Sequence, residues 1–279
     1  LLIIDYGSIT DSRLIALDLR SGTSRVLNPG EEDEERAVGS ARFSSDGRFA
    51  YYTSDQSTDF KTLRKQPVTG GEEEIVVAPP DADVEDFAIS ADGKYLGYTV
   101  NVVGESQLHL MEMATKKELP VPAIPKGTIG SLEWRAGAAE LGFSSNNSRG
   151  VNAYSLAVGG ELVQWTFSEL GGLNPDELRE PEVVRWKSFD GLEVSGFLYK
   201  PAARFTGKRP VIVNIHGGPE GQSRPGFQGS RNYYLNELGV AILYPNVRGS
   251  DGFGKTYVSL DNGRSREDSV KDIGALLDY

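Results

Sequence analysis

The chain has 279 residues, no cysteine, two histidines and a formal net charge of −11. Its length allows one or two domains, and the lack of cysteine excludes a disulfide framework, a thiol nucleophile and a cysteine-based zinc site. The first 180 residues hold 29 acidic and 16 basic residues, whereas the remainder holds 11 and 13. Such an acidic first part argues against nucleic acid or an anionic membrane as a partner, because both require basic residues.

The first 170 residues repeat a pattern of strand, Asp-Gly turn and strand. Residues 43–53 and 89–99 match each other, with Asp46 and Asp92 in register, and residues 134–144 form a weaker third copy. An Asp-Gly pair between two alternating runs is typical of a β-hairpin. Each copy therefore predicts two neighbouring antiparallel strands.

Further strand-like runs complete each repeat. After the second copy they lie at 107–113 and 118–121, and residues 13–27 resemble the same closing pair of an earlier unit. Four strands in about 40 to 50 residues are typical of a β-propeller blade. We predict about three and a half blades in residues 1–173, as part of a larger ring. A β-sandwich is the alternative, but it leaves the matched Asp-Gly turns unexplained.

A polar, proline-bounded stretch at 173–181 separates the repeats from a different pattern. It predicts a linker with one short helical turn. The runs 183–189 and 192–199 then flank Asp190 and Gly191, which predicts a hairpin with a two-residue turn.

The β-branched run at 211–215 predicts a buried parallel strand that is covered on both faces. It leads directly into His216-Gly217-Gly218-Pro219. The two glycines allow a sharp turn and the proline has no N–H, so free amides near the turn can face a cavity. A strand that runs into His-Gly-Gly is how α/β-hydrolases build part of an oxyanion hole. The alternative is a tight loop after a buried strand.

Helical and apolar patterns alternate in the last part of the chain. Residues 230–238 predict a helix that ends at Gly239, residues 240–244 predict an apolar strand that Pro245 ends, and residues 265–279 predict an amphipathic helix. The buried stripe of that last helix is predicted to comprise Val270, Ile273, Leu276 and Leu277. Alternating strands and helices predict an α/β domain with a parallel sheet over residues 174–279.

The loop at 246–254 is rich in glycine and follows a predicted strand, where open α/β sheets bind ligands. It lacks the Gly-Lys-Ser/Thr ending of a phosphate-binding loop, which excludes a nucleotide site of that kind. Arg248 in this loop either binds a substrate carboxylate or pairs with a buried acid; we favour the second interpretation.

Four motifs together resemble the prolyl oligopeptidase family of serine peptidases, and most nearly its acylaminoacyl-peptidase and dipeptidyl-aminopeptidase-like members. They are Phe-Asp-Gly-Leu at 189–192, Ile-His-Gly-Gly-Pro at 215–219, Tyr-Pro-Asn-Val-Arg-Gly-Ser-Asp-Gly-Phe-Gly at 244–254 and Glu-Asp-Ser-Val-Lys-Asp-Ile at 267–273. The resemblance implies a two-domain fold, a partial β-propeller followed by the N-terminal part of an α/β-hydrolase domain.

The resemblance also implies roles for single residues. It assigns an oxyanion-hole N–H to Gly218, beside Gly217. His216 stands where other members have a tyrosine, so we interpret it as a support of the oxyanion loop and not as the general base. The implied activity is hydrolysis of short peptides through an acyl-enzyme, as in acylaminoacyl or dipeptidyl aminopeptidases.

No serine in this chain has glycine at both i−2 and i+2, as the nucleophile of this fold requires. His109 and His216 are the two histidines, and neither lies where a base would be expected. We therefore expect an interior fragment that lacks the Ser/Asp/His triad and is inactive alone. An esterase of the same fold and a non-catalytic propeller module for protein binding are the alternative functions.

The partners expected are short peptides, with no nucleic acid and no membrane. A serine-based mechanism implies no cofactor and no metal. The oligomeric state and the compartment stay open, with the cytoplasm preferred over the periplasm.

Overall fold

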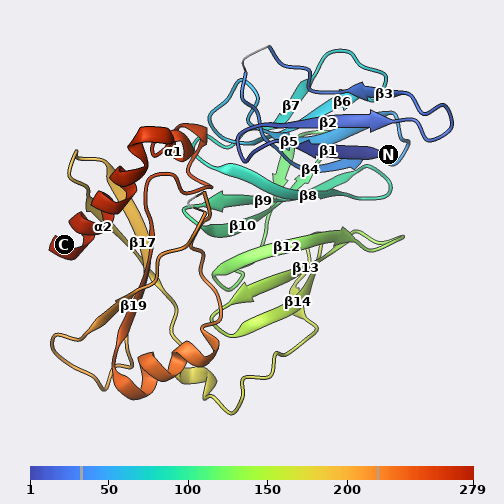
Figure 1. Cartoon of the computed structure of the whole chain (residues 1–279). Helices are drawn as coiled ribbons and strands as arrows, with labels where there is room; N and C mark the ends of the chain where they lie inside the picture. The colour runs from blue at the N-terminus through green and yellow to red at the C-terminus, as the bar shows by residue number, and fades with distance from the viewer. Residues whose placement is uncertain (32–33, 219) are drawn as a thin grey trace.

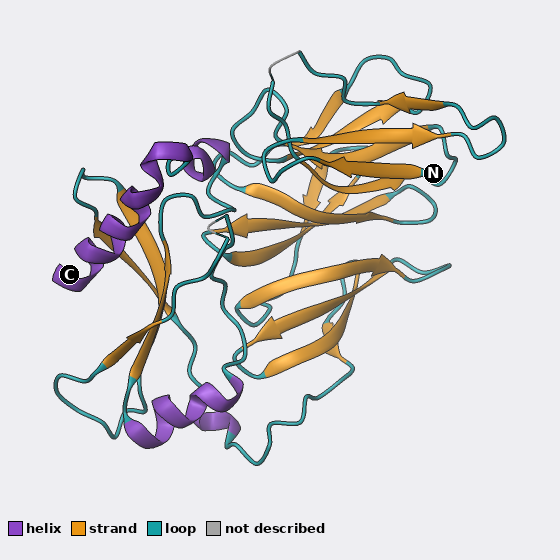
Figure 2. Ribbon diagram, viewed as in Figure 1, coloured by secondary structure: helices purple, strands orange, loops and turns teal. Residues whose placement is uncertain are grey.

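A computed structural model describes residues 1–31, 34–218 and 220–279. Five separate sheets account for the strands of these residues, and helices are few (Figures 1 and 2). No helix in the described ranges is long and apolar enough to cross a membrane.

Four antiparallel sheets lie one after another along the first part of the chain (Figure 1). In each of them, strands that are consecutive in sequence are neighbours, which is the meander expected of propeller blades. The first sheet contains β1 (Leu2–Tyr6), β2 (Ser12–Leu17) and β3 (Ser24–Val26), and the second contains β4 (Val38–Phe43), β5 (Phe49–Ser54), β6 (Thr62–Pro67) and β7 (Glu74–Val77). The third contains β8 (Asp83–Ile89), β9 (Tyr95–Val102), β10 (Glu105–Glu112) and β11 (Lys117–Leu119), and the fourth contains β12 (Gly127–Trp134), β13 (Glu140–Asn147), β14 (Gly150–Ala157) and β15 (Leu162–Gln164).

The two matched Asp-Gly turns have the same hydrogen bonds. Ser90 Oγ donates to Asp92 Oδ1 at 2.7 Å, and the Gly93 N–H donates to the Ser90 carbonyl at 2.8 Å. Gly93 has a φ of +71°, a conformation that favours glycine. The same contacts recur around Asp46, so the repeat found in the sequence is a repeat of local structure.

Apolar side chains between consecutive sheets form the core of this part. One cluster connects Leu110 of the third sheet to Leu141 and Phe143 of the fourth. A second cluster connects Leu63 of the second sheet to Phe87 of the third. Leu63, Phe87, Leu110 and Leu141 are all fully buried. Replacing such a leucine with alanine typically costs about 2–5 kcal/mol, so these clusters fix how the sheets stack.

A fifth sheet follows the linker, which contains the predicted helical turn as the short 3₁₀ helix η1 (Pro175–Glu177). The strands are β16 (Glu182–Lys187), β17 (Glu193–Tyr199), β18 (Val211–Val213) and β19 (Ala241–Asn246), in the order β16-β17-β19-β18. The two strands predicted to be parallel, β18 and β19, do pair in parallel, but the sheet as a whole is mixed, because β17 pairs with both β16 and β19 in antiparallel fashion. The hairpin β16–β17 is confirmed, but its loop is longer than two residues, because pairing ends at Lys187 and Glu193.

The strand β18 differs from its prediction. It is short and lies at the edge of the sheet, where Val211 and Ile212 are 51% and 40% exposed, and so it is not covered on both faces. Pro245 does not end β19, which continues to Asn246. Beyond Leu243 the strand β19 no longer pairs with β18, and one-sided pairing is the setting that tolerates proline in a strand.

The helical segments also differ in detail from the prediction. The single helix expected at 230–238 is the 3₁₀ turn η2 (Gly229–Arg231) and the π-helical turn η3 (Tyr234–Leu238); Gly239 ends it in the left-handed conformation, as predicted. The last segment comprises α1 (Lys255–Ser259), η4 (Gly263–Glu267) and α2 (Asp268–Asp278). Leu276 of α2 packs on one face of this sheet, with Val194 and Leu243, and Leu235 of η3 packs on the other, with Phe197 and Ile242 (Figure 1).

Candidate functional site: the loop after β18

The loop after β18 turns sharply at its second glycine. Asn214 continues the parallel pairing, since its N–H donates to the Leu243 carbonyl at 2.8 Å. Gly218 then has a φ of +128°, and a Cβ at this position would lie 2.8 Å from the backbone N of Glu220. Gly217 has no such constraint, because open space surrounds the position of its Cβ.

The N–H of Gly218 makes no hydrogen bond to another residue within the described ranges. Gly218 is exposed, so this N–H is open to solvent and can be reached by a ligand. Pro219, the residue that supplies no N–H in the sequence argument, lies outside the described residues. The oxyanion role of Gly217 and Gly218 stays a prediction.

His216 is held through its ring nitrogen Nε2. This atom lies 3.0 Å from Ser250 Oγ, and Ser250 Oγ donates to the Val247 carbonyl at 2.6 Å. Since a hydroxyl has one proton, Ser250 must accept a hydrogen bond from His216, which places the imidazole proton on Nε2. The other nitrogen faces the carbonyl of Gly217 at 3.3 Å. The ring thus ties the glycine turn to the loop after β19.

Arg248 lies at the centre of a nearly buried ion-pair network. Its side chain is 5% exposed, and its guanidinium contacts Asp272 of α2 at 2.8 Å and Asp190 of the β16–β17 loop at 2.9 Å. Its backbone N–H donates to the fully buried Asp272 as well, at 2.9 Å, and Ser188 Oγ donates to the same carboxylate at 2.5 Å. The ring of Phe189 covers the guanidinium at 4.7 Å.

Charge and burial act in opposite directions on Arg248. Burial works to lower the pKa of the guanidinium, but its hydrogen bonds to Asp272 and Asp190 outweigh burial and raise the pKa above its ordinary value. The hydrogen bond from Arg248 lowers the pKa of Asp190 in turn. Of the two interpretations of Arg248, the contacts support the buried acid: the guanidinium fastens the loop to α2 and has no free face for a substrate carboxylate.

This network explains why α2 does not bury the predicted stripe. Val270 and Leu277 are 69% and 74% exposed, while Asp272 is fully buried and Leu276 is 7% exposed. The pairing with Arg248 turns the Asp272 side of the helix inward, so the expectation for Val270 and Leu277 was wrong.

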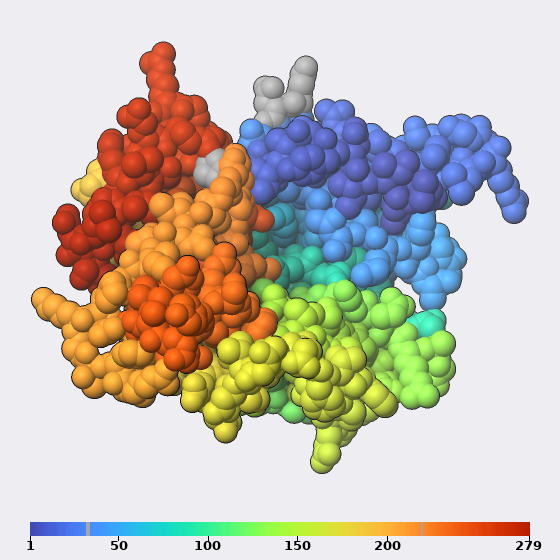
Figure 3. All heavy atoms as spheres, turned by 60° about the horizontal axis from the view of Figure 1, so that its bottom comes forward, coloured from blue at the N-terminus to red at the C-terminus, as the bar shows by residue number. Residues whose placement is uncertain are grey.

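The loops after β18 and β19 also contact the four sheets of the first part of the chain (Figure 3). Lys61, the residue before β6, lies 3.4 Å from Asp251, and Arg224 Nη2 lies 3.0 Å from Glu85 Oε2 of β8. The Arg224 Nε also donates to the Gly104 carbonyl at the tip of the β9–β10 hairpin, at 2.9 Å. Burial works to lower the pKa of Lys61, but the carboxylates of Asp83, Asp251 and Asp55 outweigh it and raise the pKa.

These contacts surround a cavity of about 340 Å³ between the two parts of the chain. Lys61, Glu85, Arg224 and Asp251 line it, so its walls are charged and come from both parts. No group of His, Cys, Asp and Glu residues within the described ranges could hold a metal ion. The loop after β18 contributes Gln222 and Arg224 to this cavity, whose walls can bind charged and hydrogen-bonding groups.

Lys61, Glu85, Arg224 and Asp272 cannot be identified as site residues from the sequence alone. Arg224 and Glu85 are 139 residues apart, and Lys61 and Asp251 are 190 apart. The one usable signal is an acidic residue within the apolar stripe of the last helix, which is Asp272. His109, by contrast, is a strand residue as expected, with its ring stacked on Tyr98 at 4.9 Å.

No family model matches the chain. Among curated proteins, dipeptidyl aminopeptidase BIII of Pseudoxanthomonas mexicana is 27% identical over 238 residues, which cover 78% of this chain and 33% of that protein. Prolyl oligopeptidase A of Amanita bisporigera is 25% identical over 84% of this chain and 32% of its own length. The uncharacterized peptidase YuxL of Bacillus subtilis is 34% identical over 132 residues, which cover 45% of this chain and 19% of YuxL. The chain therefore spans about a third or less of these relatives.

Solved structures agree with this relationship at the level of the fold. A chain from a structural study of two prolyl endopeptidases superposes on the whole of this chain with a TM-score of 0.81 and 16% identity, and 40% of that chain is covered. Puromycin hydrolase superposes on 95% with a TM-score of 0.79 and 18% identity, and 41% of it is covered.

Proposed function

We propose that this chain, whose homologues and structural neighbours are peptidases of the prolyl oligopeptidase family, forms part of a serine peptidase that hydrolyses short peptides. In this proposal, residues 1–173 are part of a β-propeller that limits access to the site. Residues 174–279 are the N-terminal part of an α/β-hydrolase domain, with the β18/β19 pair in its sheet. The names of the curated relatives and the stacked four-stranded sheets support the proposal.

The observation that carries the proposal is the exposed N–H of Gly218, which has no hydrogen-bond partner within the described ranges. In acyl transfer, a serine hydroxyl attacks the carbonyl carbon of the scissile bond, and the carbonyl oxygen gains negative charge. A backbone N–H that is fixed before the reaction stabilises this charge without reorganisation. The positive φ of Gly218 and the 2.8 Å distance between its Cβ position and the Glu220 backbone N show that this turn requires glycine, and in this proposal the turn presents the amide.

His216 supports the turn and takes no part in proton transfer. Its Nε2 proton is donated to Ser250, and its Nδ1 faces the carbonyl of its own loop. A triad base has a carboxylate on one ring nitrogen and the serine hydroxyl on the other, whereas Nε2 of His216 bonds to the hydroxyl of Ser250. We therefore expect the base, the acid and the nucleophile to be supplied by residues other than those named here.

The direct test is hydrolysis of aminoacyl-p-nitroanilides and of N-acetyl-aminoacyl-p-nitroanilides by the protein that contains this chain. We expect turnover that a serine-directed phosphonate abolishes, and no turnover by the purified 279-residue chain. Inhibitor-sensitive turnover by the 279-residue chain would contradict the proposal that other residues supply the nucleophile, the base and the acid. Faster turnover of small acyl esters than of peptides would favour an esterase, and binding of peptides without turnover in the whole protein would favour a non-catalytic module.

A further inference from the structure

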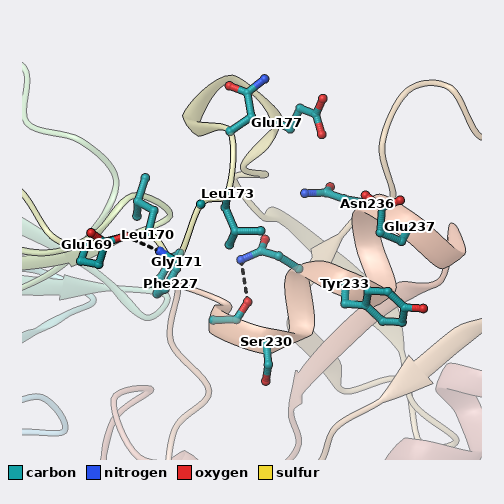
Figure 4. A pocket seen from close by; sticks show the side chains of 14 residues that line it. Glu169, Leu170, Gly171, Leu173, Glu177, Phe227, Ser230, Tyr233, Asn236 and Glu237 are labelled. Atoms are coloured by element: carbon teal, nitrogen blue, oxygen red, sulfur yellow. Dashed lines mark hydrogen bonds between the residues drawn. The ribbon is translucent and has the colours of Figure 1, made fainter.

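A second cavity lies away from the glycine turn. Its volume is about 690 Å³. It lies between residues 169–177, which include the start of the linker, and the helical turns η2 and η3 (Figure 4). The turn η3 leads into the start of β19, whereas His216 follows the end of β18, and these two strands are parallel. The cavity and the glycine turn are therefore at opposite ends of the strand pair.

Three carboxylates line this cavity: Glu169, Glu177 and Glu237. The guanidinium of Arg204 approaches two of them, at 3.9 Å from Glu177 and 3.3 Å from Glu237. Glu169 has no such partner within the described residues; one of its oxygens accepts the Gly171 N–H at 2.7 Å. The cavity thus has an excess of negative charge.

A buried amide without a partner points to a ligand. The side chain of Asn236 is 5% exposed, and its Oδ1 has no hydrogen-bond partner within the described ranges. In Figure 4 this side chain extends from η3 toward the linker, across the cavity. Asn232, one turn earlier, is satisfied, because its Nδ2 donates to the Gly229 carbonyl at 3.0 Å. Buried polar groups are usually bonded. Asn236 is one of six exceptions among the described residues, and it lines this cavity, so a bound ligand would explain it.

The remaining walls are apolar or aromatic. Leu170, Leu173, Phe227 and Tyr233 line the cavity, and Tyr233 is 58% exposed. An aromatic ring attracts an organic cation, and an apolar wall accepts the aliphatic stem of a basic side chain. The volume falls within the range of small-ligand sites and exceeds that of one side chain.

We propose that this cavity binds a basic residue of a peptide, with an arginine side chain as the best fit. The planar guanidinium pairs with the Glu169 carboxylate, while the neighbouring peptide group bonds to the amide of Asn236. This site is independent of the proposed catalysis, since it uses no residue of the glycine turn and its occupancy is measured by binding alone.

The test is calorimetric titration of the full chain with acetyl-Leu-Arg-amide and with its neutral citrulline analogue. We expect one arginine peptide per chain and binding of the citrulline peptide weaker by about tenfold. Glu169→Gln removes the charge but keeps an acceptor for the Gly171 N–H, so the fold is retained and affinity falls up to about fivefold. Glu161→Gln, at an exposed position outside the cavity, is the matched control and leaves affinity unchanged.

Asn236→Leu supplies a second readout. It removes the unbonded amide without breaking a side-chain hydrogen bond within the described residues, so the melting temperature is unchanged or higher while affinity falls. Should this variant fail to fold, the comparison of peptide affinity between the Glu169→Gln and Glu161→Gln variants still tests the proposal. Equal binding of the two peptides, the absence of saturable binding, or equal effects of the Glu169 and Glu161 variants would each overturn the proposal.

Discussion

The buried Arg248–Asp272 pair predicts a large and specific loss of stability. In Arg248→Ala the fully buried Asp272 carboxylate keeps two donors, Ser188 Oγ and the backbone N–H of residue 248, but loses its cation. Breaking one partner of a buried pair typically costs about 3–5 kcal/mol. Because two donors remain, we expect a loss of about 3 kcal/mol in the free energy of unfolding.

Urea unfolding measures this loss. Trp186 is a suitable fluorescent probe, because its Nε1 donates to the Asp272 carbonyl at 3.2 Å. The matched control is Arg185→Ala, which removes an exposed arginine that pairs with the exposed Glu193 at 3.3 Å. Such surface pairs contribute less than about 1 kcal/mol.

A double variant separates charge from packing. Arg248→Met with Asp272→Leu replaces both partners by apolar side chains, and replacing a buried pair in this way is often neutral. We expect it to be more stable than Arg248→Ala alone. A cost for Arg248→Ala as small as that for Arg185→Ala, or a double variant whose loss equals the sum of the single losses, would refute the reasoning.

Three further predictions follow from the contacts. Hydrogen bonds from Ser90 and from the backbone lower the pKa of Asp92 to about 2, so its stabilising effect is complete above pH 3.8 and is lost as the pH falls toward 2; NMR titration of Ser90→Ala should show this pKa rising toward 3.8, and an unchanged value would contradict it. Nitrogen NMR should find His216 protonated at Nε2, and a proton on Nδ1 in the neutral ring would exclude the assigned bond to Ser250. Arg224→Ala removes contacts between the two parts of the chain, so hydrogen exchange at the β9–β10 hairpin tip should become faster; unchanged exchange would show that the contact does not hold the parts together.

The features that were predictable from the sequence are those that local chemistry determines. The Asp-Gly turns recur because a short carboxylate, a serine and a glycine satisfy the same backbone groups at Asp46 and Asp92. The end of the helical segment at Gly239 is local as well, since a left-handed residue there favours glycine.

The features that were missed depend on partners far away in the chain. The run at 211–213 has the composition of a central strand, but its burial depends on which strands and helices pack on it, and in this structure it is an edge. Likewise, apolar periodicity assigned Val270 to the core, whereas the pairing of Asp272 with Arg248 turned the helix another way. For the candidate site, the motif indicated the glycine turn, but the charged walls beside it come from residues separated by more than a hundred positions.

Two neighbouring glycines test the central claim most directly. In the protein that contains this chain, Gly218→Ala forces a Cβ to within 2.8 Å of the Glu220 backbone and displaces the amide, whereas Gly217→Ala enters open space. Loss of one oxyanion donor lowers kcat by about 10²–10³. The account predicts such a loss in the peptidase activity of Gly218→Ala, with an unchanged melting temperature for Gly217→Ala and most of its activity retained. Equal kcat values for the two folded variants would contradict the assignment of the Gly218 amide to the oxyanion hole.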